Sequence, residues 1–486
     1  MILLLCLLAA IHVLVFSAAF PFFGVVDEQA QFDLVVRYSQ ADPPRTLTHI
    51  SAGALPYIVY FGTPEYLSSP EQQPGGVFVT PWSMTPQNAV RRLAPQKQMW
   101  RDVVLNYEAA QPPLYYICAG GWWRLWQALG LTDGPLLYSL RFLNALILMA
   151  IVWLAGITAL KLFPDNSFMQ VAVPALAAFF PQSIFYAINN DVLSPLTSGV
   201  AFLLLLSFWE AEIPSRRLAL ATGLSLAAVF LTKLSNLPLL AVAGLFVALK
   251  LLSLQWHGRL RESLVSLVAL LLSATLPLVA WTVWCQTNFG DPTGTAQKIS
   301  FLHWTHKPPG EWLQHPLFTA PGFWIFLKGN LATLWQGELL WHRQPLANPA
   351  VDSTYAVLTL GALAFTLVAL LRPRSSFSTP QRAAVTMAFL CFVAMFAFFA
   401  LLSVKYDFQD CFYPSRAHPY FTSGRLMLGM FIPFLILFAC GLDRLMNLFQ
   451  NSTKYLLLLA LLAFMLASEI TIDLPVFASE FNWFHL

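Results

Sequence analysis

Apolar runs of about 20 residues recur along the whole chain, with polar stretches between them. Each run is long enough to cross the hydrocarbon core of a bilayer, which is roughly 30 Å thick. The pattern predicts membrane-spanning helices near residues 2–20, 135–160, 167–187, 192–210, 217–233, 236–254, 263–285, 353–372, 382–403, 424–447 and 454–475. A shorter candidate at 113–130 carries Arg124 and several aromatic residues, a composition typical of the membrane interface.

Composition places the chain in the same class. Hydrophobic residues make up 57% of the sequence and charged residues 10%, against about 25% charged residues in soluble proteins. We expect an all-α polytopic membrane protein with about 11–12 transmembrane helices, forming one integral membrane domain over residues 1–486. The first run lacks a preceding basic segment and a good cleavage site, which favours a retained span over a signal peptide. With a net charge of +3 and no basic tail, membrane lipids are expected partners and nucleic acid is not.

The positions of arginine predict how the chain crosses the membrane. If 113–130 does not complete a crossing, the positive-inside rule puts three basic clusters on the cytoplasmic side together. These clusters are Arg216 with Arg217, Arg259 with Arg261, and Arg372 with Arg374 and Arg382. Three polar loops, 21–112, 286–350 and 404–423, then share the extracytoplasmic face. The expected location is a bacterial inner membrane, with a site on that outer face.

Cysteine and histidine give little sign of a metal or a disulfide framework. Only Cys411 lies clearly in a polar loop, and the cysteine spacing matches no zinc site. His303, His306 and His315 could be metal ligands, but histidines among tryptophans in a loop are more often packing and surface residues. No cofactor is therefore expected; a divalent metal is possible but not indicated.

Charged residues gather on the predicted outer face. Asp27 and Glu28 follow the first span, Glu108 precedes Pro112 and Pro113, and Asp191 ends the sequence Asn-Asn-Asp. The basic residues on that side are Arg141, at the start of the next span, and Arg416, His418 and Arg425, in and after the third polar loop. A solvated helix cap would explain Asp27 with Glu28, and a buried ion pair would explain any two of these residues. The whole set favours a functional site, since charges at a bilayer edge are costly unless solvated, paired or functional.

The order of these motifs resembles the GT-C fold membrane glycosyltransferases, among them protein O-mannosyltransferases and lipid A aminoarabinose transferases. The resemblance runs from about residue 20 to 445. It rests on Asp-Glu after the first span, "EAAQPPLYY", "NND", "LTKLSNLPLL", "NFGDPTG" and "SGR". Two positions depart from the family pattern: Gln111 stands where histidine usually precedes the two prolines, and Leu426 stands where tyrosine usually follows Gly-Arg.

The resemblance implies transfer of a sugar from a polyprenyl phosphate donor to a lipid, glycan or protein acceptor, and it makes Asp27 the catalytic carboxylate. Such transfer needs a base, cations for the leaving phosphate and an apolar groove for the prenyl chain. Burial at the membrane edge is expected to raise the pKa of Asp27 toward a value useful for a general base. Glu28 and Glu108 are the alternative catalytic carboxylates. A single displacement implies inversion at the anomeric carbon.

Arginine suits the phosphate because its planar fork makes bidentate bonds. Arg425 is the first choice and Arg416 the second, and His418 and Asp191 are further substrate-binding candidates. Arg141 is expected to pair with a carboxylate and orient it. Glu108 could hold Arg141, a sugar hydroxyl or the acceptor.

Two other classes of function remain open. A secondary transporter would show internal repeats and charged or broken spans near the midplane of the bilayer. We find no repeat, and Lys233, at the end of a span, is expected to snorkel outward. A GT-C-like protein that has lost activity is the other alternative.

Overall fold

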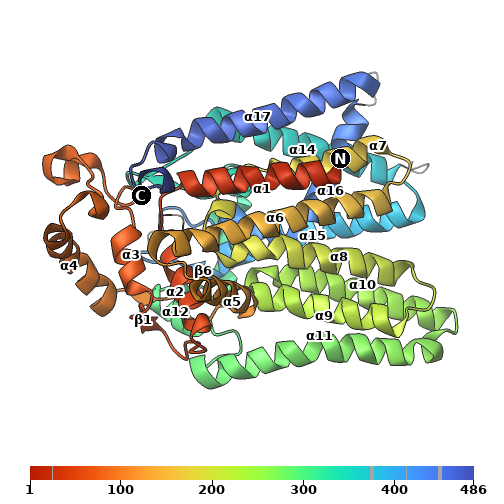
Figure 1. Ribbon diagram of the computed structural model, residues 1–486. Helices are drawn as coiled ribbons and strands as arrows, with labels where there is room; N and C mark the ends of the chain where they lie inside the picture. The colour runs from red at the N-terminus through yellow and green to blue at the C-terminus, as the bar shows by residue number, and fades with distance from the viewer. Residues whose placement is uncertain (25, 373–376, 412, 447–450) are drawn as a thin grey trace.

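The computed structural model describes residues 1–486 except 25, 373–376, 412 and 447–450, and leaves out the side chains of 451 and 452. The described chain is almost entirely helical. Its long helices are α1 (Ile2–Ala19), α6 (Asp133–Leu162), α8 (Ser194–Glu210), α9 (Arg216–Thr232), α10 (Leu237–Trp256), α11 (Leu260–Phe289), α13 (Ala320–Gln336), α14 (Pro349–Leu371), α15 (Thr379–Lys405), α16 (Phe431–Met446) and α17 (Asn451–Phe477). Figure 1 shows most of them lying side by side.

Further helices and short strands connect these helices. The remaining α-helices are α2 (Glu28–Ser39), α3 (Leu55–Phe61), α4 (Pro86–Asp102), α5 (Leu114–Ala128), α7 (Ser167–Ala178) and α12 (Ala296–Phe301). The described strands form three antiparallel two-residue pairs: β1 (Thr48–His49) with β2 (Leu105–Asn106), β3 (Thr305–His306) with β6 (Tyr406–Asp407), and β4 (Leu340–Trp341) with β5 (Gln344–Pro345). Both α4 and α3 lie beyond one end of the bundle (Figure 1).

The expected fold class, an all-α polytopic membrane protein, is confirmed. Among the described residues, nine helices are long and apolar enough to cross a membrane. Two of the predicted spans fall short of that length. The segment 217–233 is the 17-residue α9, and 167–187 contains only the 12-residue α7.

The predicted span 167–187 stops at Ala178 because the following residues satisfy their polar groups outside a helix. Pro181 cannot donate a helical hydrogen bond. Gln182, which is buried, donates to the backbone oxygens of Thr333 and Leu334 in α13 at 3.0 and 2.7 Å. The chain then forms a 3₁₀ turn, η4 (Ser183–Tyr186), and remains buried up to Asp191.

The basic clusters lie together at one end of the bundle, as the sequence predicts. Lys161, at the end of α6, pairs with Glu210 at the end of α8, and Arg259, before α11, pairs with Glu212. Gln381, at the start of α15, donates to the oxygen of Leu162 at 2.9 Å. Arg374 lies outside the described residues.

The three polar loops meet at the opposite end. Thr46 of the first loop donates to Gln297 of the second at 3.0 Å, and the β3–β6 pair joins the second loop to the third. The C-terminus lies at the same end (Figure 1). We call it the loop end.

Helix α5, in the predicted non-crossing segment 113–130, also stays at the loop end. At 1.5 Å per residue its 15 residues extend only about 22 Å, less than the hydrocarbon thickness. It packs on α2, and Trp122 donates to the oxygen of Ser139 in the second turn of α6 at 2.8 Å.

Candidate functional site at the loop end

Three membrane spans begin with a 3₁₀ turn at the loop end, and these turns pack against one another. They are η5 (Asn190–Leu193) before α8, η6 (Leu234–Asn236) before α10, and η9 (Gly424–Met430) before α16. Pro195 and Pro238 occupy the first turns of α8 and α10, where the missing proline N–H costs no helical bond. The positive ends of three helices therefore converge on one region.

Arg425 is the centre of this region. Its Nη2 lies 2.8 Å from Oδ2 of Asp27, its Nη1 lies 2.7 Å from Oδ2 of Asp191, and its Nε lies 3.2 Å from Oε2 of Glu338. The arginine side chain is only 7% exposed. We call Arg425, Lys233 and these three carboxylates the charge cluster.

A close approach of two backbones fixes Arg425. A Cβ atom on the preceding residue, Gly424, would lie 2.2 Å from the backbone nitrogen of Leu334 and 2.3 Å from the backbone oxygen of Asn330. Only glycine fits there, because the turn rests directly on α13. Glu338 follows α13 by two residues, so the same contact sets the distance between Arg425 and Glu338.

Asp27 caps α2 in a left-handed conformation, with φ of 67°. Such a φ is uncommon outside glycine, and aspartate is among the residues that tolerate it. Tyr107 donates its hydroxyl to Oδ1, and Arg425 holds Oδ2. The Asn189 side chain donates to the oxygen of Val26 at 3.3 Å, which fixes Asp27 beside Asp191.

We expected the position of Asp27 at the membrane edge to raise its pKa. The pKa is instead lowered. Burial does act to raise it, but the charges of Arg425 and Lys298 and the hydrogen bond from Tyr107 outweigh burial and lower the pKa below its ordinary value. The aspartate therefore stays ionised at neutral pH.

Lys233 is buried in the charge cluster and does not snorkel outward as we expected. Its ammonium group pairs with Oδ1 of Asp191 and donates to Oδ1 of Asn190 at 3.0 Å. Asp191 thus binds Lys233 with one oxygen and Arg425 with the other. This double pairing leaves its carboxylate without a free oxygen.

Glu108 extends the network toward solvent. One of its oxygens pairs with Lys298 of α12, and the other accepts from Gln111. Gln111 in turn accepts from Asn190 at 3.1 Å, which links this arm to Lys233. The partner of Glu108 is therefore Lys298 rather than Arg141.

Glu338 differs from the other carboxylates in having a free oxygen. Its Oε1 is buried and has no hydrogen-bond partner among the described residues. Burial raises the pKa of Glu338 above its ordinary value, against the opposing effect of Arg425. This oxygen can take up a proton or accept a hydrogen bond from a hydroxyl of a ligand.

Glu28 and Arg141 form a separate, fully buried pair. The Nε and Nη2 atoms of Arg141 donate to the two Glu28 oxygens at 2.9 and 2.8 Å. Glu28 also accepts from the backbone nitrogens of Phe23 and Ile188, both at 2.9 Å. The pair therefore joins the start of α2 to α6 and to the segment that leads to Asp191. This agrees with the expectation that Arg141 pairs with a carboxylate.

Arg416 and His418 are not brought to the charge cluster. Arg416 is exposed and pairs with Asp407 at 3.0 Å, across the turn that follows β6. The ring of His418 stacks with that of Tyr413 and meets that of Tyr420 edge to face, and burial lowers the pKa of His418. In the described chain, both residues shape the third polar loop.

The histidines of the second loop do not converge either. His303 and His306 are exposed. His315 accepts from the backbone nitrogen of Leu317 at 3.0 Å and has its other ring nitrogen 3.1 Å from the oxygen of Pro419, so both nitrogens serve packing. No group of three or more histidine, cysteine or acidic residues in the described chain has the geometry of a metal site.

Sequence reasoning did not assign Lys298, Glu338 or Tyr107 to the site. Lys298 and Glu338 lie far apart within the long second loop. No periodic hydrophobic pattern in this loop predicts where their side chains lie in the fold. Lys298 follows the "NFGDPTG" motif by four residues, which was the available signal. Tyr107 precedes Glu108 directly, so its place could have been inferred from that of Glu108.

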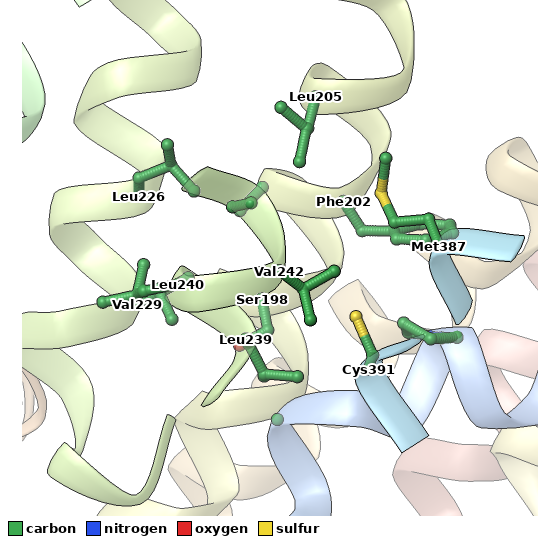
Figure 2. Close-up of a pocket in the computed structure, with 14 residues that line it drawn as sticks. Ser198, Phe202, Leu205, Leu226, Val229, Leu239, Leu240, Val242, Met387 and Cys391 are labelled. Carbon is green, nitrogen blue, oxygen red and sulfur yellow. The ribbon is translucent and has the colours of Figure 1, made fainter. Parts of the chain in front are cut away.

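An apolar pocket lies further along the spans that begin at the charge cluster. Its cavity volume is about 30 Å³, and its lining comes mainly from α8 and α10, with further side chains from α9 and α15. Figure 2 shows Phe202, Val242 and Met387 grouped around it. Ser198 and Gly429, also in the lining, lie about two turns beyond Asp191 and about one turn beyond Arg425. The two spans that carry the cluster thus continue into the pocket wall.

No protein-family model matches the chain, and no curated protein matches it. Among solved structures, the chain is similar to the archaeal oligosaccharyltransferase AglB from Archaeoglobus fulgidus, solved with an inhibitory peptide and a dolichol-phosphate. The identity is 13%, the TM-score is 0.41, and the match covers 97% of this chain but only 56% of AglB. At this TM-score the likeness does not establish a function for this chain.

Proposed function

We propose that this integral membrane protein transfers a sugar from a polyprenyl phosphate donor to an acceptor at the loop end, on the extracytoplasmic side of the membrane. One observation carries the proposal: a cluster of basic and acidic side chains lies at three converging helix N-termini, and an apolar pocket lies one to two turns further along the same spans. A lipid phosphate has the matching chemistry, because it joins an anionic group to a hydrocarbon chain. The GT-C-like order of the sequence motifs also supports it.

The donor would bind with its prenyl chain in the apolar pocket and its phosphate toward the loop end. Helix N-termini are favourable places for anions, because their free N–H groups and the helix dipole both attract negative charge. Lys233, Lys298 and Arg425 add three positive charges. Glu338 Oε1 would accept a hydrogen bond from a hydroxyl of the sugar or of the acceptor.

The chemical step would be a single displacement with inversion. The acceptor oxygen forms a bond to the anomeric carbon while the bond from that carbon to the phosphate oxygen breaks, and its electron pair stays on the phosphate. Asp27 would take the acceptor proton. Its lowered pKa makes it a weak base but keeps it ionised, and Tyr107 and Arg425 hold it in place. Side-chain cations stabilise the leaving phosphate in this scheme.

Mass spectrometry of envelope lipids and glycoconjugates from a strain lacking the protein tests this proposal. We expect one sugar to disappear from its acceptor and its polyprenyl phosphate carrier to accumulate. A strain with unchanged glycoconjugates and carriers, under conditions in which the protein is produced, would contradict the transferase. A transported solute that no longer crosses the membrane would favour the transporter instead.

A further inference from the structure

The basic residues that contact the site carboxylates differ in how freely they can reach a ligand. Three of them occur among the described residues: Arg425, Lys233 and Lys298. Arg425 uses all three of its nitrogen atoms on carboxylates and is 7% exposed. Lys233, also 7% exposed, is shared between Asp191 and Asn190. Both side chains are nearly covered, so a phosphate would have to enter the buried cluster to reach either one.

Lys298 is placed differently. Its side chain is 30% exposed, and Glu108 is its one ion-pair partner in the described chain. An ammonium group has three N–H donors, so at least one remains available to a ligand. The residue lies on α12, the six-residue helix of the second polar loop, rather than within a membrane span.

The position of Lys298 is also close to the proposed base. Its Nζ lies 5.2 Å from the centre of the Tyr107 ring, and the hydroxyl of that tyrosine is bonded to Asp27. Glu108, the partner of Lys298, follows Tyr107 directly in the chain. The lysine therefore occupies the wall of the site between solvent and Asp27.

We propose that Lys298 is the residue that binds the phosphate of the lipid-linked donor, and that Glu108 holds the lysine in place until the donor arrives. This inference rests on the proposed function and identifies the phosphate-binding side chain. It moves that role from Arg425, which becomes a positioning residue for Asp27 and Asp191.

The exchange of partners has a favourable balance of charges. When Lys298 turns to the phosphate, Glu108 keeps its hydrogen bond from Gln111 and is the only carboxylate to lose a cation. If Arg425 turned instead, three carboxylates would lose a cation at once, and of these only Asp191 would keep another in the described chain, Lys233. An unpaired buried charge is strongly destabilising.

The same lysine stabilises the product of transfer. Cleavage of the bond between the anomeric carbon and the phosphate oxygen leaves the electron pair on oxygen, so a phosphodiester monoanion becomes a polyprenyl phosphate dianion. The acceptor proton goes to Asp27. The ammonium of Lys298 neutralises part of the charge that develops on the phosphate and makes charge-assisted bonds to its oxygens.

Binding measurements on purified full-length variants test this proposal, with farnesyl phosphate as the probe and farnesol as its uncharged counterpart. We expect Lys298→Gln to raise the Kd for farnesyl phosphate about tenfold or more, the effect of losing a charge-assisted bond, and to leave the Kd for farnesol unchanged. Lys298→Arg should retain most of the affinity. Lys307→Gln, which removes a lysine from the same loop, is the matched control and should bind as wild type does.

A second variant distinguishes a phosphate-binding lysine from a structural ion pair. Glu108→Gln frees Lys298, so farnesyl phosphate should bind at least as tightly as to wild type. Weaker binding to Glu108→Gln, or an unchanged Kd in Lys298→Gln, would overturn the role of Lys298. A wild-type protein that binds farnesyl phosphate no better than farnesol would overturn the donor class, and with it the proposed function.

Discussion

The Nη2 atom of Arg425 lies 2.8 Å from Oδ2 of Asp27, a contact between residues 398 positions apart in the chain. It joins the polar segment after the first span to the start of α16. Since the same arginine also holds Asp191 and Glu338, one side chain assembles acidic groups from three separate parts of the sequence. The geometry of the site therefore depends on Arg425.

Replacing Arg425 should affect both folding and activity. Arg425→Ala leaves three buried carboxylates without their shared partner, and breaking such a pair costs about 3–5 kcal/mol. We expect a clearly lowered melting temperature and loss of transfer. Arg425→Lys should recover only part of each, because one ammonium cannot reach three carboxylates as a guanidinium does.

Arg416→Ala provides the control for this prediction. Its arginine is exposed and pairs with Asp407 at the surface, where an ion pair contributes about 0–1 kcal/mol. Its melting temperature and transfer rate should stay close to wild type. If Arg416→Ala abolished transfer and Arg425→Ala did not, the site would have to be moved to the third polar loop.

The buried pair of Glu28 and Arg141 should prove structural. Glu28→Gln leaves the arginine charge unpaired at a position with no solvent exposure, so thermal unfolding should show a loss of about 3–5 kcal/mol. Glu71→Gln, an exposed acid of the same loop, should melt as wild type does. A Glu28→Gln protein with wild-type melting but no transfer would instead make Glu28 the catalytic carboxylate.

Much of this fold could be predicted because a bilayer imposes a length on every apolar helix. Hydropathy located all nine long spans, and the arginine clusters correctly grouped the loops at the two ends of the bundle. The hydropathy pattern failed at 167–187, where the apolar residues continue past Ala178 although the helix ends there. Gln182 ends the helix by bonding to α13, a partner that no local pattern reveals.

The candidate site was predictable in part for a related reason. Charges at a membrane edge are conspicuous, so Asp27, Glu108, Asp191 and Arg425 could be singled out, and the structure brings all four into one network. Lys298 and Glu338 lie in a polar loop where charge is ordinary. The pKa of Asp27 was misjudged because burial was considered without the charges of Arg425, Lys298 and Lys233 and the hydrogen bond from Tyr107.

His315 should make stability depend on pH. Burial, with a contribution from Lys307, lowers its pKa to about 4, while in the unfolded chain histidine titrates near 6.5. Between these values the unfolded chain takes up a proton that the folded protein does not, so the stability that this residue contributes is lost as pH falls from about 6.5 to 4.

Melting temperatures of wild type and His315→Asn between pH 7.5 and about 5 check this. The wild-type advantage should shrink as the pH falls, and the imidazole NMR signal should titrate near pH 4. An advantage that grew on acidification would show that His315 gains a proton in the folded state.

The orientation in the membrane can be tested with single cysteines introduced into a cysteine-free protein. Cysteines at 215 and 258 lie at the end that carries the arginine clusters, and those at 71 and 310 lie at the loop end; all four positions are exposed. An impermeant thiol reagent applied outside intact cells should label 71 and 310 only. Labelling of 215 and 258 in place of these would put the site on the cytoplasmic face.

The most direct test of the account is the transfer rate of purified Asp27→Asn with a polyprenyl phosphate sugar, compared with wild type and with Asp407→Asn. The amide keeps the size and polarity of Asp27 but cannot take up the acceptor proton, so the rate should fall about 10² to 10⁴-fold. The melting temperature should stay near wild type, because Arg425 keeps Asp191 and Glu338 as partners. Asp407→Asn, at the exposed pair with Arg416, should transfer normally. A folded Asp27→Asn protein that transfers sugar at the wild-type rate would contradict the account.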